Sequence, residues 1–395
     1  MNLPFLKNKL SSKNPEFPSK INLAIQLKSN GLYGIVYTFD GKNMDILGVD
    51  KVLCPNNLIN SFDEGELKKE QYLLQQLKDK VSAFSSSSFK KPVVGIPLNN
   101  TISKLISIRY KRKNPKKKIT KKEISNILQN TLKKADIELN EDFKDIYEDS
   151  YAHLEIVQYT IAFTKIDGYI TTDLHNQRGS VIEISIYVTY APSSYLKNIV
   201  DYFSLANFKP QALTTSVYSL SKYFNYLNPK EDNYILVDLG AFTTEIGIIF
   251  GKELIATTYF NIGYKDFFIY ASEIMGINPK ELLSSKELLD KSKSILRDIQ
   301  DFWALYFSSK LSSLKGIKVF PSNIYFVGNN QSKISTESFF TSLESLSFKG
   351  TPTLKTIDLG LENVLQKDLI ETNYNSKKFL GVLSLAYLSK NLFNK

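Results

Sequence analysis

Apolar residues follow two spacings along the chain, one typical of strands and the other of helices. Short apolar or alternating runs predict strands at Ile21–Thr38 (two runs around a polar turn), Asp45–Leu53, Pro92–Ile96, Tyr234–Val237, Ile246–Phe250, Glu253–Tyr259 and Ile324–Val327. Helical spacing predicts helices at Asp63–Ala83, Pro192–Tyr202, Thr215–Leu227 and over most of Tyr264–Lys315. The chain therefore mixes strands and helices along its whole length.

The stretch from residue 119 to residue 190 has a pattern of its own. Thr120 is placed to cap a helix, with Glu123 three residues later as its capping-box partner, and this helix is predicted to end near Lys134. Strand-like segments follow at Val157–Thr164, Gly168–Asp173 and Ser180–Tyr190, and they predict a small sheet.

The last predicted helix, Ser376–Phe393, is apolar on almost every side. Phe379, Leu383 and Leu388 are among its apolar residues. A helix of this kind packs in a core rather than lying in a membrane interface.

Composition excludes several classes of protein. The chain has 395 residues, enough for two domains or more, and no apolar run approaches the roughly 18 residues of a membrane span. Met1–Lys20 reads as a polar tail, so export is not expected. Cys54 is the only cysteine, which excludes an internal disulfide and fits the cytoplasm. His153 and His175 lack neighbours at metal-ligand spacing, which disfavours zinc.

The net charge of +10 is concentrated in one segment. Arg109–Lys122 holds nine Lys or Arg residues and no acid. Such a block favours an anionic partner, for which membrane headgroups, an acidic protein tail and nucleic acid are alternatives. A solvated loop explains it equally well. Nucleic acid is the weakest of these partners, because Tyr110 is the segment's only aromatic residue and no binding motif accompanies it.

A strand, a polar turn and a second strand follow one another over Asn233–Phe250. The turn carries the sequence Asp238-Leu239-Gly240-Ala241-Phe242-Thr243-Thr244. Its backbone N–H groups and two hydroxyls suit a phosphate, Gly240 allows close approach, and Asp238 is placed to hold Mg²⁺. An ordinary hairpin turn is the alternative.

This hairpin resembles the second phosphate loop of the superfamily of actin, hexokinase and heat-shock chaperones. A similar strand–turn–strand unit opens the first half of the chain, and the later IYFVGNN, with Gly328, Asn329 and Asn330, resembles the adenosine loop. The resemblance implies an α/β, actin-like (duplicated ribonuclease H-like) two-domain fold. It also implies ATP and Mg²⁺ as cofactors, bound between the two loops.

Within the superfamily the chain resembles FtsA, the actin-like cell-division protein, from Ile21 almost to the end. ITKKEI resembles the start of FtsA's inserted α+β subdomain, and the segment with Gly263 resembles FtsA's PVGG segment. PilM, a pilus assembly protein, shares this layout. The resemblance implies a tail at 1–20 and a first domain made of 21–91 and 191–231, with an insertion at 92–190. The second domain consists of 232–265 and 320–395, and a helical subdomain at 266–319 is inserted in it.

The first phosphate loop departs from the family pattern. Where the family has Asp-Ile-Gly-Thr/Ser, this chain has Gln26-Leu27-Lys28-Ser29. Gln26 supplies no charge to a Mg²⁺ shell, which argues against efficient ATP hydrolysis. Two alternatives remain for binding. Either the ammonium of Lys28, with Ser29 and Asn30, replaces part of the metal's charge and contacts the phosphates, or the cleft no longer binds nucleotide.

The resemblance implies a cytoskeletal adaptor for cell division. Such a protein binds a filament-forming tubulin homologue at the inner face of the cell membrane, and it polymerises head to tail. The alternative is a PilM-like clamp that holds a short peptide of a partner in a pilus or secretion platform. An active kinase or ATPase is a third interpretation, and Gln26 argues against it.

Overall fold

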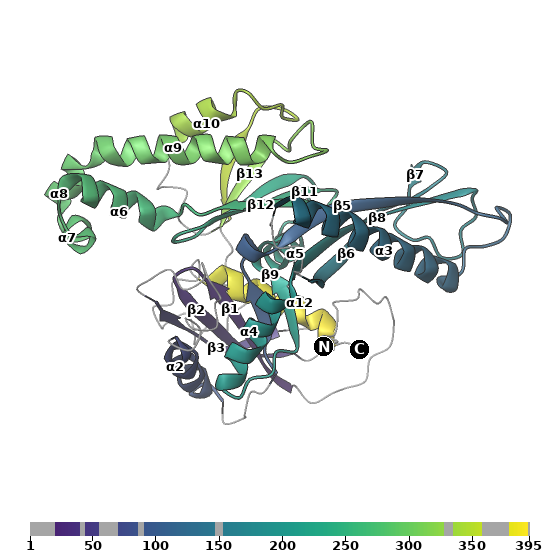
Figure 1. Cartoon of the computed structure of the whole chain (residues 1–395), viewed down its shortest axis with the longest axis horizontal. Helices are drawn as coiled ribbons and strands as arrows, with labels where there is room; N and C mark the ends of the chain where they lie inside the picture. The colour runs from purple at the N-terminus through teal and green to yellow at the C-terminus, as the bar shows by residue number, and fades with distance from the viewer. Residues whose placement is uncertain are drawn as a thin grey trace.

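The computed structural model describes residues 20–39, 44–54, 70–85, 91–146, 153–327, 335–357 and 379–393. The expected tail therefore lies outside the described residues, apart from Lys20. The described residues form three sheets, covered by helices (Figure 1).

The first sheet contains five strands in the order β3-β2-β1-β4-β9. Its strands are β1 Lys20–Lys28, β2 Gly31–Phe39, β3 Met44–Leu53, β4 Val93–Ile96 and β9 Ala212–Thr215. The first three form an antiparallel meander, and β4 and β9 add in parallel. Because successive side chains of a strand point to opposite faces, β1 supplies two cores.

Helices cover both faces of this sheet. Leu23, Ile25 and Leu27 of β1 face α2 and α4, whereas Ala24 faces α5 and α12. The helices are α2 Gln71–Ser82, α4 Ser193–Leu205, α5 Ser216–Leu227 and α12 Leu380–Phe393.

The second sheet repeats this topology, with the order β12-β11-β10-β13-β14. Its strands are β10 Tyr234–Leu239, β11 Thr244–Phe250, β12 Glu253–Phe260, β13 Asn323–Val327 and β14 Thr353–Ile357. An antiparallel meander is again extended by two parallel strands. Two sheets of one topology confirm the α/β, duplicated actin-like fold.

A third sheet, order β5-β8-β6-β7, is inserted between the first-sheet strands β4 and β9. It contains β5 Ile102–Lys111, β6 Leu154–Ile166, β7 Tyr169–Ile170 and β8 Val181–Pro192, after a short 3₁₀ turn, η1 Leu98–Asn100. The helix α3 Lys121–Ile146 packs on one face, and the whole unit projects to one side (Figure 1).

Three sequence expectations need correction in this region. β4, expected to open the insertion, pairs with β1 and β9 of the first sheet. α3 runs well past Lys134, because Ala135 and Leu139 continue its buried row. The strand expected at Gly168–Asp173 is limited to β7, because Asp173 accepts the N–H of His175 and turns the chain away. The remaining domain boundaries stay predictions.

Four helices follow β12 and form a subdomain beside the second sheet. They are α6 Tyr264–Met275, α7 Pro279–Ser284, α8 Lys286–Lys291 and α9 Lys293–Ser312, and α10 Thr336–Leu343 packs beside α9. Trp303 of α9 is fully buried, and its indole N–H donates to the hydroxyl of Thr244, at 2.9 Å. The core of the second half is thereby tied to the start of β11.

The expectation that the last helix packs in a core is confirmed. α12 was assigned to the second domain, but it covers the first sheet and contacts α5, where Ser384 lies 2.9 Å from Ser219. No helix in the described part of the chain has the length and hydropathy that crossing a bilayer requires.

Candidate functional site

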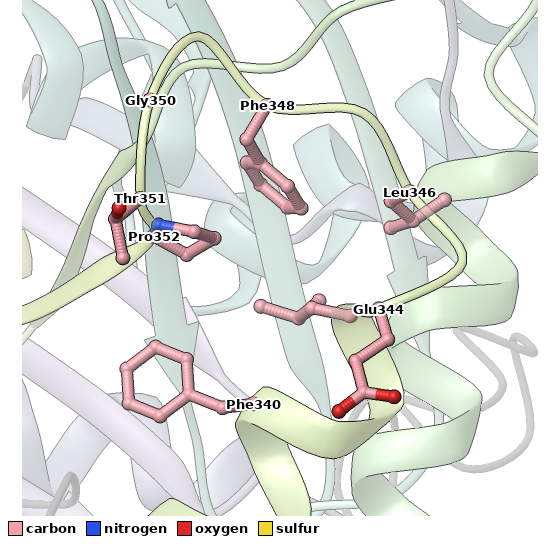
Figure 2. Close-up of a pocket in the computed structure, with 8 residues that line it drawn as sticks. Phe340, Glu344, Leu346, Phe348, Gly350, Thr351 and Pro352 are labelled. Carbon is pink, nitrogen blue, oxygen red and sulfur yellow. The ribbon is translucent and has the colours of Figure 1, made fainter.

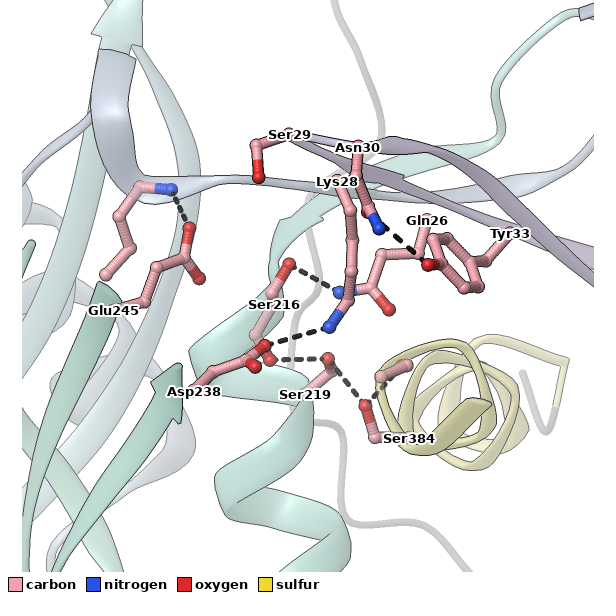
Figure 3. A network of polar contacts seen from close by, with 12 residues as sticks. Gln26, Lys28, Ser29, Asn30, Tyr33, Ser216, Ser219, Asp238, Glu245 and Ser384 are labelled. Atoms are coloured by element: carbon pink, nitrogen blue, oxygen red, sulfur yellow. Dashed lines mark hydrogen bonds and ion pairs between the residues drawn. The ribbon is translucent and has the colours of Figure 1, made fainter. Parts of the chain in front are cut away.

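Two hairpin turns face each other between the first and second sheets. The β1–β2 turn carries Lys28 and Ser29, and the β10–β11 turn carries Gly240 to Thr243. Ser29 Oγ accepts the N–H of Phe242 at 3.3 Å. Lys28 Nζ lies 3.1 Å from Asp238 Oδ2 (Figure 3). The sequence prediction that these loops oppose one another across a crevice is therefore confirmed.

Little space remains between the two turns. The cavity there has a volume of about 20 Å³, close to that of a single water molecule. The residues lining it come from both halves of the chain: Gln26, Leu27, Lys28, Ser29, Pro97, Ser216, Asp238, Gly240, Thr243 and Glu245.

The ion pair between Lys28 and Asp238 is largely shielded from water. The Lys28 side chain is 20% exposed and that of Asp238 is 9% exposed. Burial lowers the pKa of Lys28, but attraction to and a hydrogen bond with Asp238, together with the charges of Tyr33 and Glu245, outweigh burial, so the net pKa lies above the ordinary value. Lys28 is therefore a cation at neutral pH, placed directly against Asp238, the carboxylate that the sequence of the turn predicted to hold Mg²⁺.

The residues at this site do not fit a magnesium–triphosphate group. Lys28 already neutralises Asp238, and the remaining cavity is far smaller than a triphosphate. Gln26 is 1% exposed and donates from Nε2 to Ser216 Oγ at 2.8 Å, so it presents a neutral amide. Among the described residues, no cluster of three or more His, Cys, Asp or Glu side chains has the arrangement of a metal site.

The second turn is held rigidly by its own contacts and by the start of α6. The N–H of Gly240 donates to Thr243 O at 2.8 Å, and the N–H of Tyr264 donates to Gly240 O at 2.9 Å. A Cβ added to Gly263 would lie 2.4 Å from the nitrogen of Phe242, so only glycine allows this close approach. Gly263 therefore positions the turn.

Individual candidate residues divide between cleft and core. Thr243 lines the cavity, whereas the hydroxyl of Thr244 is fully buried and donates to Ile262 O at 2.7 Å. Thr244 therefore faces the core of the second half and not the cleft. Asn30 accepts from the hydroxyl of Tyr33 at 3.3 Å (Figure 3). Ala241 accepts the N–H of Lys265, which joins its carbonyl to α6.

Glu245 is a cleft residue that the sequence reasoning did not single out as a site residue. It is 6% exposed, and its Oε1 accepts the N–H of Leu98 at 2.7 Å. Burial, together with repulsion from Asp238, raises the pKa of Glu245 to about 8, so the carboxyl is mostly protonated at neutral pH. The hairpin register was the available indication, because Asp238 and Glu245 are cross-strand partners and share a face.

The adenosine side of the expected site is only partly described. Gly328, Asn329 and Asn330 lie outside the described residues. A hollow of about 450 Å³ lies elsewhere, between α10 and β14, and shares no residue with the cleft (Figure 2). Phe340, Leu346 and Phe348 make it largely apolar, and Glu344 is the one ionisable side chain among its described lining residues.

Comparisons with known proteins agree with the fold. No protein-family model matches the chain, and no curated protein sequence matches it. Among solved structures, the chain is similar to the "PilM-PilN type IV pilus biogenesis complex", with a TM-score of 0.63, 12% identity, and coverage of 94% of this chain and 98% of the other.

A second similar structure is the ethanolamine utilization protein EutJ from Carboxydothermus hydrogenoformans. The TM-score is 0.50 with 10% identity, and the match covers 95% of this chain and 92% of EutJ. At such identities the similarity establishes the fold: this chain has the actin-like ATPase fold, of which PilM is one example.

Proposed function

We propose that this chain is a non-catalytic actin-fold adaptor, most similar in role to PilM, that holds a short segment of a partner protein. The partner is a component of a membrane-associated assembly such as a pilus or secretion platform. This places the chain in the cytoplasm, at the inner face of the cell membrane. The proposal gives the fold a binding role in place of ATP turnover.

One observation carries this proposal. The Lys28–Asp238 ion pair occupies the position between the two phosphate loops and leaves about 20 Å³. A cleft filled in this way retains the architecture of the fold without the metal charge that phosphoryl transfer needs. The similarity to the PilM–PilN structure, whose printed name describes a complex of two proteins, favours partner binding as the remaining role.

The test uses the full chain and synthetic peptides. The peptides are the short cytoplasmic N-termini of any membrane proteins encoded by genes that neighbour that of this chain, and calorimetry measures their affinity. Hydrogen exchange then locates the site where the peptide binds, and we expect protection of the inserted strands β5, β6 and β8. No binding, or protection confined to the cleft around Lys28 and Asp238, would contradict the proposal.

The FtsA-like role is the second candidate, and an exposed apolar row on α9 favours it. Phe302, Leu305 and Tyr306 are 48%, 62% and 42% exposed, and the last two follow Phe302 by about one helical turn. Such a row suits contact with a filament-forming tubulin homologue or with another copy of this chain.

Co-sedimentation with filaments of the tubulin homologue tests this second role. Leu305→Glu is expected to abolish co-sedimentation, whereas Ile137→Glu is a control, because Ile137 is equally exposed, at 62%, on α3. Failure of the wild-type chain to sediment with the filaments would remove the FtsA-like role and leave the peptide-binding role intact.

A further inference from the structure

The outer end of the inserted subdomain brings together the basic segment and a hairpin. Lys111, at the end of β5, pairs with Val181, at the start of β8, and this end of the sheet is opposite the end that leads into α4. Ile166 pairs with both Tyr169 and Ile182, so the β6–β7 hairpin lies at the same end. We call residues 111–122 and 166–181 the tip, which lies far from the body of the molecule (Figure 1).

Hydrogen bonds join the segments of the tip. Arg112 donates from its backbone N–H to Ser180 O at 2.8 Å and from its guanidinium to Gly179 O at 3.0 Å. The carboxylate of Asp167, in the hairpin turn, accepts the N–H of Val181 at 2.8 Å. The N–H of Ile119 donates to Gln177 O at 2.8 Å. The basic loop and the hairpin are thus parts of one ordered surface.

Among the described residues, most cations of the tip form no ion pair. Arg112 pairs with Glu123 at 2.7 Å, and its side chain is 3% exposed. The other eight Lys and Arg residues of Arg109–Lys122 form no ion pair within the part of the chain that the structure describes. Four of them line a hollow of about 500 Å³ at the start of α3: Lys113, Lys117, Lys118 and Lys122. This hollow is a place where anionic groups are attracted.

The hairpin adds an apolar element beside these charges. Tyr169 and Ile170 are 80% and 73% exposed, the highest values among the large apolar residues described. They follow a tight turn in which Asp167 and Gly168 have φ of 50° and 89°. A short turn of this kind makes the pair project from the end of the sheet instead of lying in a groove.

We propose that the tip docks on an anionic lipid bilayer, with Tyr169 and Ile170 entering the interface and the lysines of Arg109–Lys122 contacting lipid phosphates. Each part suits the bilayer for a separate reason. Clustered Lys and Arg are attracted to anionic headgroups within a Debye length. A projecting aromatic and aliphatic pair places apolar surface at the boundary between headgroups and acyl chains.

A bilayer fits this surface better than a folded protein partner does. Two projecting side chains bury too little area for a stable protein interface, for which about 800 Å² per partner is typical. A membrane surface, in contrast, accommodates a convex tip and supplies many phosphates at once. The eight cations of Arg109–Lys122 that form no ion pair with described residues therefore match a surface that carries a high density of negative charge.

Vesicle co-sedimentation with the full chain tests the proposal. Wild type is expected to bind vesicles of equal parts phosphatidylglycerol and phosphatidylcholine. It is not expected to bind vesicles of pure phosphatidylcholine, and high salt is expected to release it from the anionic vesicles. The variant Lys116→Glu, Lys117→Glu, Lys118→Glu is expected to bind at least roughly a hundredfold more weakly, because three charges are reversed. Tyr169→Ser with Ile170→Ser is expected to weaken binding about tenfold or more.

Matched controls separate a local site from general charge. Lys280→Glu, Lys315→Glu, Lys318→Glu changes the net charge by the same amount on the helical subdomain, and Ile137→Ser removes an exposed apolar residue from α3 outside the tip. Both controls are expected to bind as wild type does. Equal loss in the tip and control lysine variants, or unchanged binding in either tip variant, would overturn the proposal. Circular dichroism of each variant confirms that the fold is retained.

A fluorescent probe tests insertion directly. Tyr169→Cys is labelled with an environment-sensitive dye, which is selective because Cys54 is buried. Anionic vesicles are expected to shift the emission to the blue at position 169, and no shift is expected for the same dye at Ile137→Cys. A dye at position 169 that stays in water while the protein sediments with vesicles would exclude the insertion of the hairpin.

Discussion

Lys28 and Asp238 are 210 residues apart in sequence, and their side chains meet across the cleft with 3.1 Å between Nζ and Oδ2. One partner comes from the first sheet and the other from the second. Since both side chains are mostly buried, removal of either one leaves the other charge without compensation. The pair therefore joins the two halves of the fold.

Lys28→Met is expected to lower the free energy of unfolding by about 3 kcal/mol, because the Asp238 carboxylate is left buried and unpaired. Asp238→Asn is expected to cost a similar amount. Urea titration followed by the fluorescence of Trp303, the chain's only tryptophan, measures both. Lys209→Met, at an exposed position, is the control. If the losses in the free energy of unfolding from Lys28→Met and Asp238→Asn add in the double variant, the two side chains do not interact.

Mg²⁺–ATP is expected to leave the melting temperature of the wild-type chain unchanged. The physical reason is the filled position between the loops, where Lys28 already neutralises Asp238. Differential scanning fluorimetry over a range of ATP concentrations provides the measurement, and a phosphate-release assay accompanies it. A saturable rise in melting temperature, or steady phosphate release, would show that the cleft opens to nucleotide.

Glu245 is expected to make stability depend on pH. Its pKa is raised to about 8 in the folded chain from an ordinary value near 4.5, so the folded state binds the proton more tightly than the unfolded state does. This contribution is complete below about pH 4.5 and is lost as the pH rises through about 8. Thermal unfolding of wild type and Glu245→Gln across this range is the test. The variant is expected to lose less stability on the alkaline side, and parallel curves would exclude the effect.

Gly381→Ala is expected to destabilise the packing of α12. A Cβ at this position would lie 1.9 Å from Oε1 of Gln26, whose side chain is 1% exposed and is held by its hydrogen bond to Ser216. We expect a loss of about 1–3 kcal/mol, typical of an overpacked core. The double variant Gln26→Ala, Gly381→Ala has no such clash. Its loss in the free energy of unfolding is therefore expected to be smaller than the sum of the losses in the two single variants. If the losses of the two single variants, measured by chemical denaturation, simply add in the double variant, Gly381 and Gln26 are not in contact.

Local pattern predicted the hairpins well, because alternation along a strand specifies its buried face. The end of α3 was missed because Ala135, the next residue of the buried row after Lys134, is small, although Leu139 continues that row. The position of β4 was missed because a short apolar strand fits either of two neighbouring sheets. An all-round apolar helix such as α12 likewise does not indicate which sheet it covers.

The site shows the same division between local and long-range information. The Asp238–Thr243 and Lys28–Ser29 turns were both predicted from the local strand pattern, and the expectation that they face each other came from a family resemblance. Ser216 was not predicted to line the cleft, because its hydrogen bond with Gln26 joins residues 190 positions apart in the sequence. Glu245 was overlooked because a carboxylate in a strand is usually solvated, and its burial depends on the approach of Leu98 from the first half.

The placement of α12 has a consequence for biosynthesis. Leu385 packs against Gly95 of β4, and Ala24 of β1 lies in the same core, yet the ribosome makes α12 long after either strand. This face of the first sheet is therefore only partly covered, by α5, until α12 is made, while the insertion and the second sheet already have their helices. The apolar surface that α12 will cover is exposed to other polypeptides until α12 emerges, so we expect chaperones to protect this sheet during synthesis.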